Sequence, residues 1–240
     1  MPGLVAPASF LEQAAGFGVA FEPGEVERLG RYLSLLLAAN ELVNLTAVRE
    51  VEPAWERLIF DALTLLPVLA DLPEDARVID VGTGGGLPGI PLAIVSPGFR
   101  VTLLEPTGKK AAFLRHAVSE LGLTNVTVVR DRAETIAGHS AGSEHRGGYD
   151  AVVARAVGRL RALAELTVPL AKVGGVVALV KGQKADEELA EAKAALHMLH
   201  ATHAGTVDTP TGRIVVLEKR RETPAKYPRS SGEIKRHPLG

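Results

Sequence analysis

The most constraining feature of this sequence is a cluster of glycines that directly follows a short apolar segment. Residues 78–81 read Val-Ile-Asp-Val, and residues 82–89 read Gly-Thr-Gly-Gly-Gly-Leu-Pro-Gly. The apolar segment is typical of a buried strand, and Pro88 stands where it can open a helix. Glycine permits a positive φ and lets the backbone approach a bound molecule closely. The sequence therefore predicts a strand–turn–helix unit whose turn contacts a ligand.

From Arg77 onward, strand-like and helix-like segments alternate. The expected strands are 77–81, 100–105, 126–130, 151–154 and 176–180, and the expected helices are 88–96, 107–121, 159–171 and 184–196. This alternation is typical of a doubly wound, Rossmann-like α/β fold, in which helices cover both faces of a mostly parallel sheet. A last strand, 213–218, follows a turn-like Thr-Pro-Thr-Gly segment and is expected to pair antiparallel at one edge.

Composition divides the chain into three parts. Residues 1–73 are expected to form an N-terminal helical cap, with helices at 8–18, 24–41 and 50–70; residues 74–222 form the core, and residues 223–240 form an irregular basic tail. Residues 1–76 carry 4 Lys or Arg against 12 Asp or Glu, whereas residues 213–240 carry 8 against 3. Such a tail favours a polyanionic partner, although a tail kept basic for solubility gives the same count.

Several classes of protein are disfavoured by what the sequence lacks. The chain has no cysteine, which excludes disulfides, thiolate metal sites and cysteine nucleophiles. It has no leader-like N-terminus and no apolar run long enough to cross a bilayer, so we expect a soluble, cytoplasmic protein without membrane contact. His197, His200 and His203 are evenly spaced, but no acid joins them, and no metal site is expected.

Two cofactors fit the glycine turn. Read from Gly84, residues 84–89 match the Gly-x-Gly-x-x-Gly pattern of dinucleotide sites, but the strand ends near Val81 and Pro88 would interrupt a pyrophosphate turn. Read from Asp80, the pattern is acid-x-Gly-x-Gly-x-Gly, which resembles the first motif of class I methyltransferases. Glu105, about 20 residues on, is placed to hold ribose hydroxyls. The sequence therefore favours S-adenosylmethionine, whose ammonium and sulfonium charges suit an acid beside the loop.

Two features that the sequence lacks reduce the number of possible methyl acceptors. Without cysteine the chain lacks the thiolate that 5-methylpyrimidine enzymes use. After the fourth expected strand the exocyclic-amine motif, Asn/Asp-Pro-Pro-Tyr/Phe, is also missing, and the chain reads Ala154-Arg155-Ala156 instead. A cation where a base is expected suits methylation of guanine N7, which has a free lone pair and loses no proton.

Seven segments together resemble the RsmG (GidB) family of bacterial 16S ribosomal RNA methyltransferases. These segments are 44–49 (Asn-Leu-Thr-Ala-Val-Arg), the loop 81–93, 108–114 (Gly-Lys-Lys-Ala-Ala-Phe-Leu), 132–134 (Arg-Ala-Glu), 154–156, Lys181-Gly182 and 227–229 (Tyr-Pro-Arg). They span about residues 40–230 in the order found in the family. The resemblance implies S-adenosylmethionine-dependent transfer to guanine N7 of 16S ribosomal RNA, free or in the small subunit, by a monomeric enzyme.

The resemblance also implies roles for individual residues. Residues expected to hold the cofactor are Asp80, Gly82, Gly84, Leu87, Glu105, Ala133, Glu134 and Arg155. The residues expected to be catalytic are Arg155, Arg132 and Lys181. The RNA contacts are expected at Lys109, Lys110 and Arg229. Four cations of the tail, Lys226, Arg229, Lys235 and Arg236, are expected to bind RNA and to lie outside the glycine-loop pocket.

Departures and alternatives remain at this stage. Leu58 and Ala62 stand where relatives often carry His and Ser, and residues 138–148 resemble a local surface insertion. Arg132 and Arg155 are alternatively buried partners of Glu134 or Asp150. The whole chain is alternatively a small-molecule methyltransferase or a cofactor-binding RNA or assembly factor that performs no chemistry.

Overall fold

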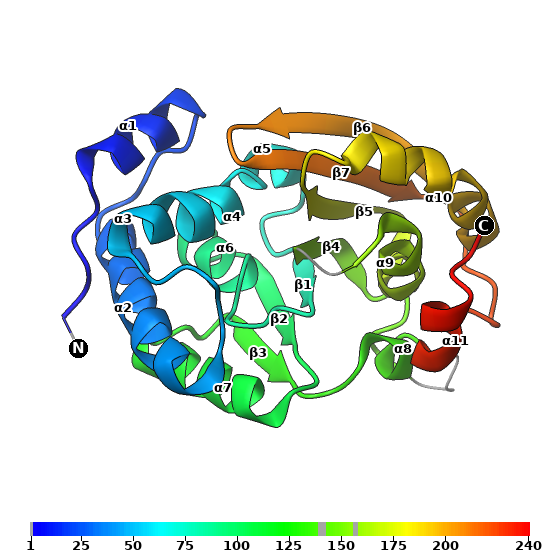
Figure 1. The fold of residues 1–240 in the computed structure, drawn as a ribbon, viewed down its shortest axis with the longest axis horizontal. Coiled ribbons are helices and arrows are strands. Elements are labelled where there is room, and N and C mark those ends of the chain that lie inside the picture. The colour runs from blue at the N-terminus through cyan, green and yellow to red at the C-terminus, as the bar shows by residue number, and fades with distance from the viewer. Residues whose placement is uncertain (1, 139–142, 156–157) are drawn as a thin grey trace.

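The strand before the glycine cluster lies in the middle of the five parallel strands of the sheet (Figure 1). The computed structural model describes residues 2–138, 143–155 and 158–240. Strand β1 (Arg77–Val81) pairs in parallel with β2 (Arg100–Leu104) and with β4 (Tyr149–Arg155). Strands β3 (Val126–Val129) and β5 (Ala171–Lys181) extend the parallel sheet on either side. The strand order β3-β2-β1-β4-β5 brings the carboxyl ends of all five to one edge.

A C-terminal hairpin completes the sheet. Strand β7 (Gly212–Lys219) pairs antiparallel with β5, and β6 (Ala201–Thr209) pairs antiparallel with β7. The expected strand at 213–218 is therefore confirmed as antiparallel, but it lies inside the sheet, and β6 is the edge. Sequence reasoning missed β6 because most of its side chains are polar or small and reach solvent.

Helices cover both faces, as the alternation predicts. One face packs under α1 (Ala8–Gly16), α2 (Glu25–Val43), α6 (Gly89–Val95) and α7 (Gly108–Glu120). The other packs under α8 (Ala133–Ile136), α9 (Leu160–Thr167) and α10 (Ala185–Leu199). Successive residues of β1 serve opposite faces, Val78 the first and Ile79 the second, because side chains alternate along a strand. The doubly wound fold is confirmed.

The expected helix at 50–70 is broken into four pieces. These are α3 (Val51–Ala54), the π-helical turn η1 (Trp55–Phe60), α4 (Asp61–Leu63) and α5 (Leu66–Leu69). Its apolar residues, Trp55, Leu58 and Ile59 among them, are buried as expected. A π-helical turn is uncommon and is found frequently at functional sites. Here it ends beside Asp61, whose carboxylate contacts Arg155.

Two further expectations are wrong. The expected helix at 159–171 ends at Thr167, and the strand expected at 176–180 begins at Ala171 after the 3-10 turn η2 (Val168–Leu170). Gly174 and Gly175 therefore lie within β5, where its register with β4 shifts. The tail, expected to be irregular, contains a helix, α11 (Ser231–Arg236), which begins with a capping box formed by Ser230 and Glu233.

Among the described residues, none of the helices combines the length and the hydropathy that a membrane-spanning helix needs.

Candidate cofactor and substrate site

The glycine turn is held by backbone hydrogen bonds at the carboxyl ends of β1 and β2. The amides of Gly82 and Thr83 donate to the carbonyl of Leu104, at N···O distances of 2.9 and 3.2 Å. Gly84 has a φ of 59°, and a Cβ at this position would meet no heavy atom closer than 4.0 Å. The conformation therefore favours glycine, and the absent side chain leaves open space beside the backbone.

Asp80 braces this turn from inside the protein. Its fully buried carboxylate accepts hydrogen bonds through Oδ2 from Thr83 Oγ1 (2.5 Å) and from the amide of Gly89 (2.8 Å), so it joins the two ends of the turn. Its Oδ1 atom has no hydrogen-bond partner. Burial raises the pKa of Asp80 to about 6, against the opposing effect of its two hydrogen bonds. The position explains why an acid precedes the glycines, and direct contact of Asp80 with the cofactor stays a prediction.

Glu105 joins the turn to the next helix. Its buried carboxylate accepts from the amide of Gly84 (3.1 Å) and from that of Thr107 (2.8 Å), just before α7. Tyr32, from α2, donates its hydroxyl to the carbonyl of Gly85 (2.8 Å). The N-terminal helices therefore hold the turn directly. Tyr32 lies beside the apolar stripe of its helix, which predicts its burial but does not reveal the partner of its hydroxyl.

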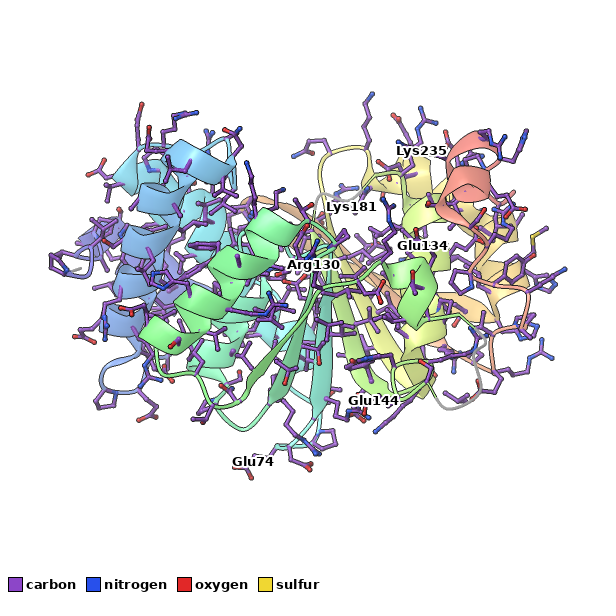
Figure 2. The ribbon with its side chains drawn as sticks, turned by 90° about the horizontal axis from the view of Figure 1, so that it is seen from below. Glu74, Arg130, Glu134, Glu144, Lys181 and Lys235 are labelled. Carbon is purple, nitrogen blue, oxygen red and sulfur yellow. The ribbon has the colours of Figure 1, made fainter. Side chains whose placement is uncertain are left out.

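A cavity of about 580 Å³ opens at the carboxyl ends of β1 and β2. Its lining includes Gly82, Arg132, Ala133 and Glu134, so the structure brings these predicted site residues together. It also includes four residues of α11: Ser231, Gly232, Ile234 and Lys235. The expectation that the tail cations lie outside the glycine-loop pocket is therefore wrong for Lys235. Figure 2 shows Glu134, Lys181 and Lys235 toward one end of the molecule, with Glu74 and Glu144 at the opposite end.

A second cavity, of about 790 Å³, lies at the carboxyl ends of β4 and β5 and is lined by Arg155 and Lys181. Arg155 Nη1 donates to Oδ2 of Asp61 (3.0 Å) and to the carbonyl of Arg57 (2.9 Å), at the π-helical turn. Lys181 Nζ lies 2.7 Å from both Glu188 Oε2 and the carbonyl of Gly158. Gly158 lines the first cavity, so its hydrogen bond with Lys181 links one lining residue of each cavity.

The structure does not show Arg132 or Arg155 as a buried partner of Glu134 or Asp150, the alternative that the sequence left open. Arg155 pairs with Asp61, whereas Asp150 pairs with Lys172. Arg132 does approach Glu134 (3.6 Å), but 63% of its side chain is exposed, so it is not buried. The motif residue Ala156, like residues 139–142 of the 138–148 segment, lies outside the described residues.

The predicted RNA contacts have different surroundings. Lys109 is exposed and Lys110 is half-buried, both in the first turn of α7. The guanidinium of Arg229 instead makes two hydrogen bonds, of 2.8 and 2.7 Å, to the fully buried carboxylate of Glu165. This pair fixes the tail to α9, and contact of Arg229 with RNA stays a prediction. Among the described residues, no cluster of three or more His, Cys, Asp or Glu could hold a metal ion.

Leu87, the remaining predicted cofactor residue, is buried at the end of the turn. The fold and the glycine turn define a Rossmann-like, S-adenosylmethionine-dependent methyltransferase. A solved structure with similar fold is a mutant of MtNAS in complex with S-adenosylmethionine (TM-score 0.53, 18% identity, 81% of this chain and 75% of that one).

The chain belongs to the rRNA small subunit methyltransferase G (GidB) family, whose sequence profile matches residues 25–214. It is 49% identical to the ribosomal RNA small subunit methyltransferase G of Sorangium cellulosum, over 94% of this chain and 92% of that protein. It is 42% identical to the protein of the same name from Rubrobacter xylanophilus, over 96% and 90%. The resemblance seen in the sequence is therefore confirmed.

Proposed function

We propose that this protein transfers the methyl group of S-adenosylmethionine to N7 of a guanine in 16S ribosomal RNA. The observation that carries the proposal is that two cavities lie at the carboxyl ends of neighbouring parallel strands, one bordered by the glycine turn and the other lined by Arg155 and Lys181. Membership of a ribosomal RNA methyltransferase family supports the class of substrate.

The first cavity fits the cofactor in size and chemistry. Its volume lies in the range of small-molecule sites, and Val81, Leu104 and Pro106 give it apolar walls suited to an adenine ring. In this proposal Gly82 and Gly84 approach the methionine and ribose portions, Glu105 accepts from the ribose hydroxyls, and the backbone at 133–134 borders the adenine. When bound, the cofactor supplies an electrophilic methyl group on a sulfonium.

The second cavity suits a reaction that removes no proton from its target. Two of its carboxylates, Asp61 and Glu188, are engaged in ion pairs with Arg155 and Lys181. The guanine N7 lone pair attacks without prior deprotonation, so the residues here need to align the base and exclude water. Arg155 and Lys181, with rigidly held nitrogen atoms, would orient the guanine and the phosphates around it.

Exposed cations extend this surface for the RNA backbone. Lys109, Arg132, Lys184 and Lys235 all follow the carboxyl ends of strands or line the cavities there. Phosphate contacts from such side chains position an RNA without reading its sequence. Arg132 lines the proposed cofactor cavity and is proposed to contact RNA and cofactor alike.

The decisive experiment is transfer of a labelled methyl group to small ribosomal subunits, and to naked 16S RNA, from cells that lack the protein. The proposal expects one labelled guanine, modified at N7, in at least one of the two substrates. Labelling of a small molecule instead of RNA would show a different methyltransferase, and cofactor-dependent RNA binding without label would show a non-catalytic factor.

A further inference from the structure

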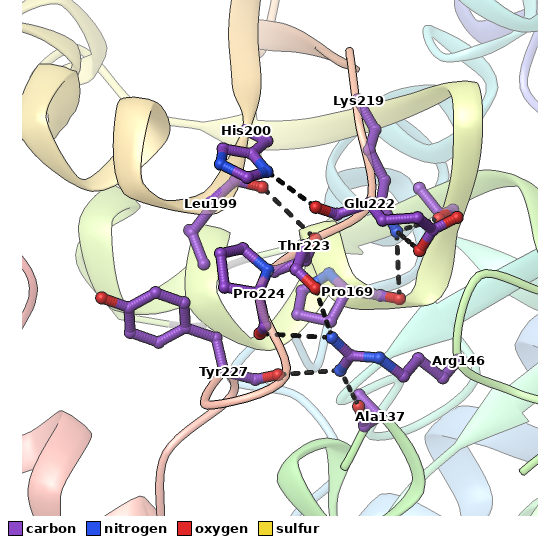
Figure 3. Close-up of polar contacts among 11 residues, drawn as sticks. Ala137, Arg146, Pro169, Leu199, His200, Lys219, Glu222, Thr223, Pro224 and Tyr227 are labelled. Atoms are coloured by element: carbon purple, nitrogen blue, oxygen red, sulfur yellow. Dashed lines mark hydrogen bonds and ion pairs between the residues drawn. The ribbon is translucent and has the colours of Figure 1, made fainter. Parts of the chain in front are cut away.

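The C-terminal tail is fixed to the core along its whole length. Arg229 pairs with the buried Glu165, Tyr227 is buried, and Ile234 of α11 is 5% exposed. A further contact with the tail comes from a single side chain, Arg146, shown in Figure 3. Its Nη1 donates to the carbonyl of Tyr227 (2.7 Å), and its Nη2 donates to those of Thr223 (2.7 Å) and Pro224 (3.4 Å).

The same guanidinium also contacts the other side of the cofactor cavity. Nη1 of Arg146 donates to the carbonyl of Ala137, the residue directly after α8, at 2.6 Å. Helix α8 supplies Ala133 and Glu134 to the cavity, and the tail supplies Ile234 and Lys235. Figure 1 draws α8 and α11 next to each other, and both helices contact α9. One planar, rigid fork of donors thus ties together two segments that line the same cavity.

We propose that α11 is a structural wall of the S-adenosylmethionine site and that Arg146 is the positioning residue that holds this wall against α8. The inference rests on the proposed cofactor site. If the wall is displaced for most of the time, the binding-competent fraction falls, and the apparent affinity falls in proportion. The charge of the tail by itself suggests an RNA-binding segment. In this proposal its first effect is instead on the affinity for the cofactor.

The test measures S-adenosylhomocysteine affinity by calorimetry, together with hydrogen exchange of residues 223–239. Ile234→Asp places a carboxylate at a buried position and should undock α11, raising exchange in the tail and weakening binding by about tenfold. His237→Ala is the control, because His237 directly follows the same helix, is exposed, and does not line the cavity. It should bind as the unmodified protein does.

Arg146 is tested with two variants. Arg146→Ala should raise exchange in residues 223–227 and weaken S-adenosylhomocysteine binding by about tenfold. Arg146→Lys should rescue it only in part, because one ammonium cannot reproduce the fork that reaches carbonyls on both segments. Arg220→Ala, which removes a surface arginine paired with Glu218, should change neither property.

Two failures are distinguishable. If the unmodified protein does not bind S-adenosylhomocysteine at all, the proposed cofactor site is wrong. If it binds, and Ile234→Asp undocks the tail by hydrogen exchange with unchanged affinity, the wall is not part of the site and the inference is overturned. Should Ile234→Asp fail to fold, the same comparison is made with Arg146→Lys, and undiminished affinity with a loosened tail overturns the inference equally.

Discussion

Nη1 of Arg155, at the carboxyl end of β4, lies 3.0 Å from Oδ2 of Asp61, at the start of α4. The two side chains are 20% and 10% exposed, so the pair is largely removed from water. It joins the proposed catalytic arginine to the N-terminal helices, and the carbonyl of Arg57 adds a second contact from the π-helical turn. The position of Arg155 therefore depends on a segment that precedes the methyltransferase core.

Arg155→Ala should lower turnover by about a hundredfold or more, since a well-placed electrostatic contact is typically worth that much. It should also cost about 3 kcal/mol of stability, because removing one partner of a largely buried ion pair leaves the other, Asp61, without its cation. The control is the double variant Arg155→Ala, Asp61→Ala, in which much of the stability returns and turnover does not. Recovery of both, measured by methyl transfer and urea unfolding, would make the arginine a structural brace and nothing more.

Gly84→Asp should abolish binding of S-adenosylmethionine in calorimetry while the protein stays folded. The new carboxylate would enter the open space beside the turn and lie near Glu105, whose Oε2 accepts from the Gly84 amide. Gly122→Asp is the matched control, since Gly122 also has a positive φ (63°) and open surroundings but follows α7, away from the turn. Binding of NAD by the unmodified protein would contradict the chosen reading of the glycine pattern.

The buried Asp80 predicts a specific pH dependence of stability. Its pKa is about 6 in the folded protein, against 3.8 as the ordinary value. Between these values the unfolded chain has ionised while the folded carboxyl retains its proton, so stability falls as the pH rises from about 4 to about 6 and the loss is complete above that. The expected loss is about 3 kcal/mol.

Asp80→Asn isolates that contribution, because an amide keeps an acceptor for Gly89 and does not titrate in this range. Urea unfolding of both proteins at pH 4 and pH 7 should show a smaller decrease for the variant. Equal decreases in the two proteins would mean that other groups carry the pH dependence.

Replacing Lys109 and Lys110 with alanine should flatten the salt dependence of RNA affinity, by about one to two units of the logarithmic slope, because each phosphate contact releases condensed counterions. The matched control replaces Arg100 and Lys172, which pair with Asp75 and Asp150 at the opposite ends of the strands. The control should leave the slope unchanged. If both double variants bind RNA with the original slope, the RNA lies on another surface.

The sequence alone was enough to determine the fold class, the glycine turn and the class of cofactor, because each of these depends on residues that are close together in the chain. Alternation of side chains along β1, and glycines that adopt a positive φ at positions 82 and 84, are properties of a few adjacent residues. The sequence did not predict β6, because this exposed edge strand has no alternation of apolar residues. It also did not predict α11, a short helix whose main local signal is the capping box of Ser230 and Glu233.

The tertiary structure alone decided which groups meet. Arg155 and Asp61 are 94 residues apart in the sequence, Arg229 and Glu165 are 64 apart, and Arg146 reaches Tyr227 across 81. A buried charged side chain needs a partner of opposite charge or a hydrogen-bonding group. The amino-acid sequence does not tell which residue that partner is. That choice follows from how the helices pack on the sheet, and here it brings residues of a basic tail into the lining of the cavity beside the glycine turn.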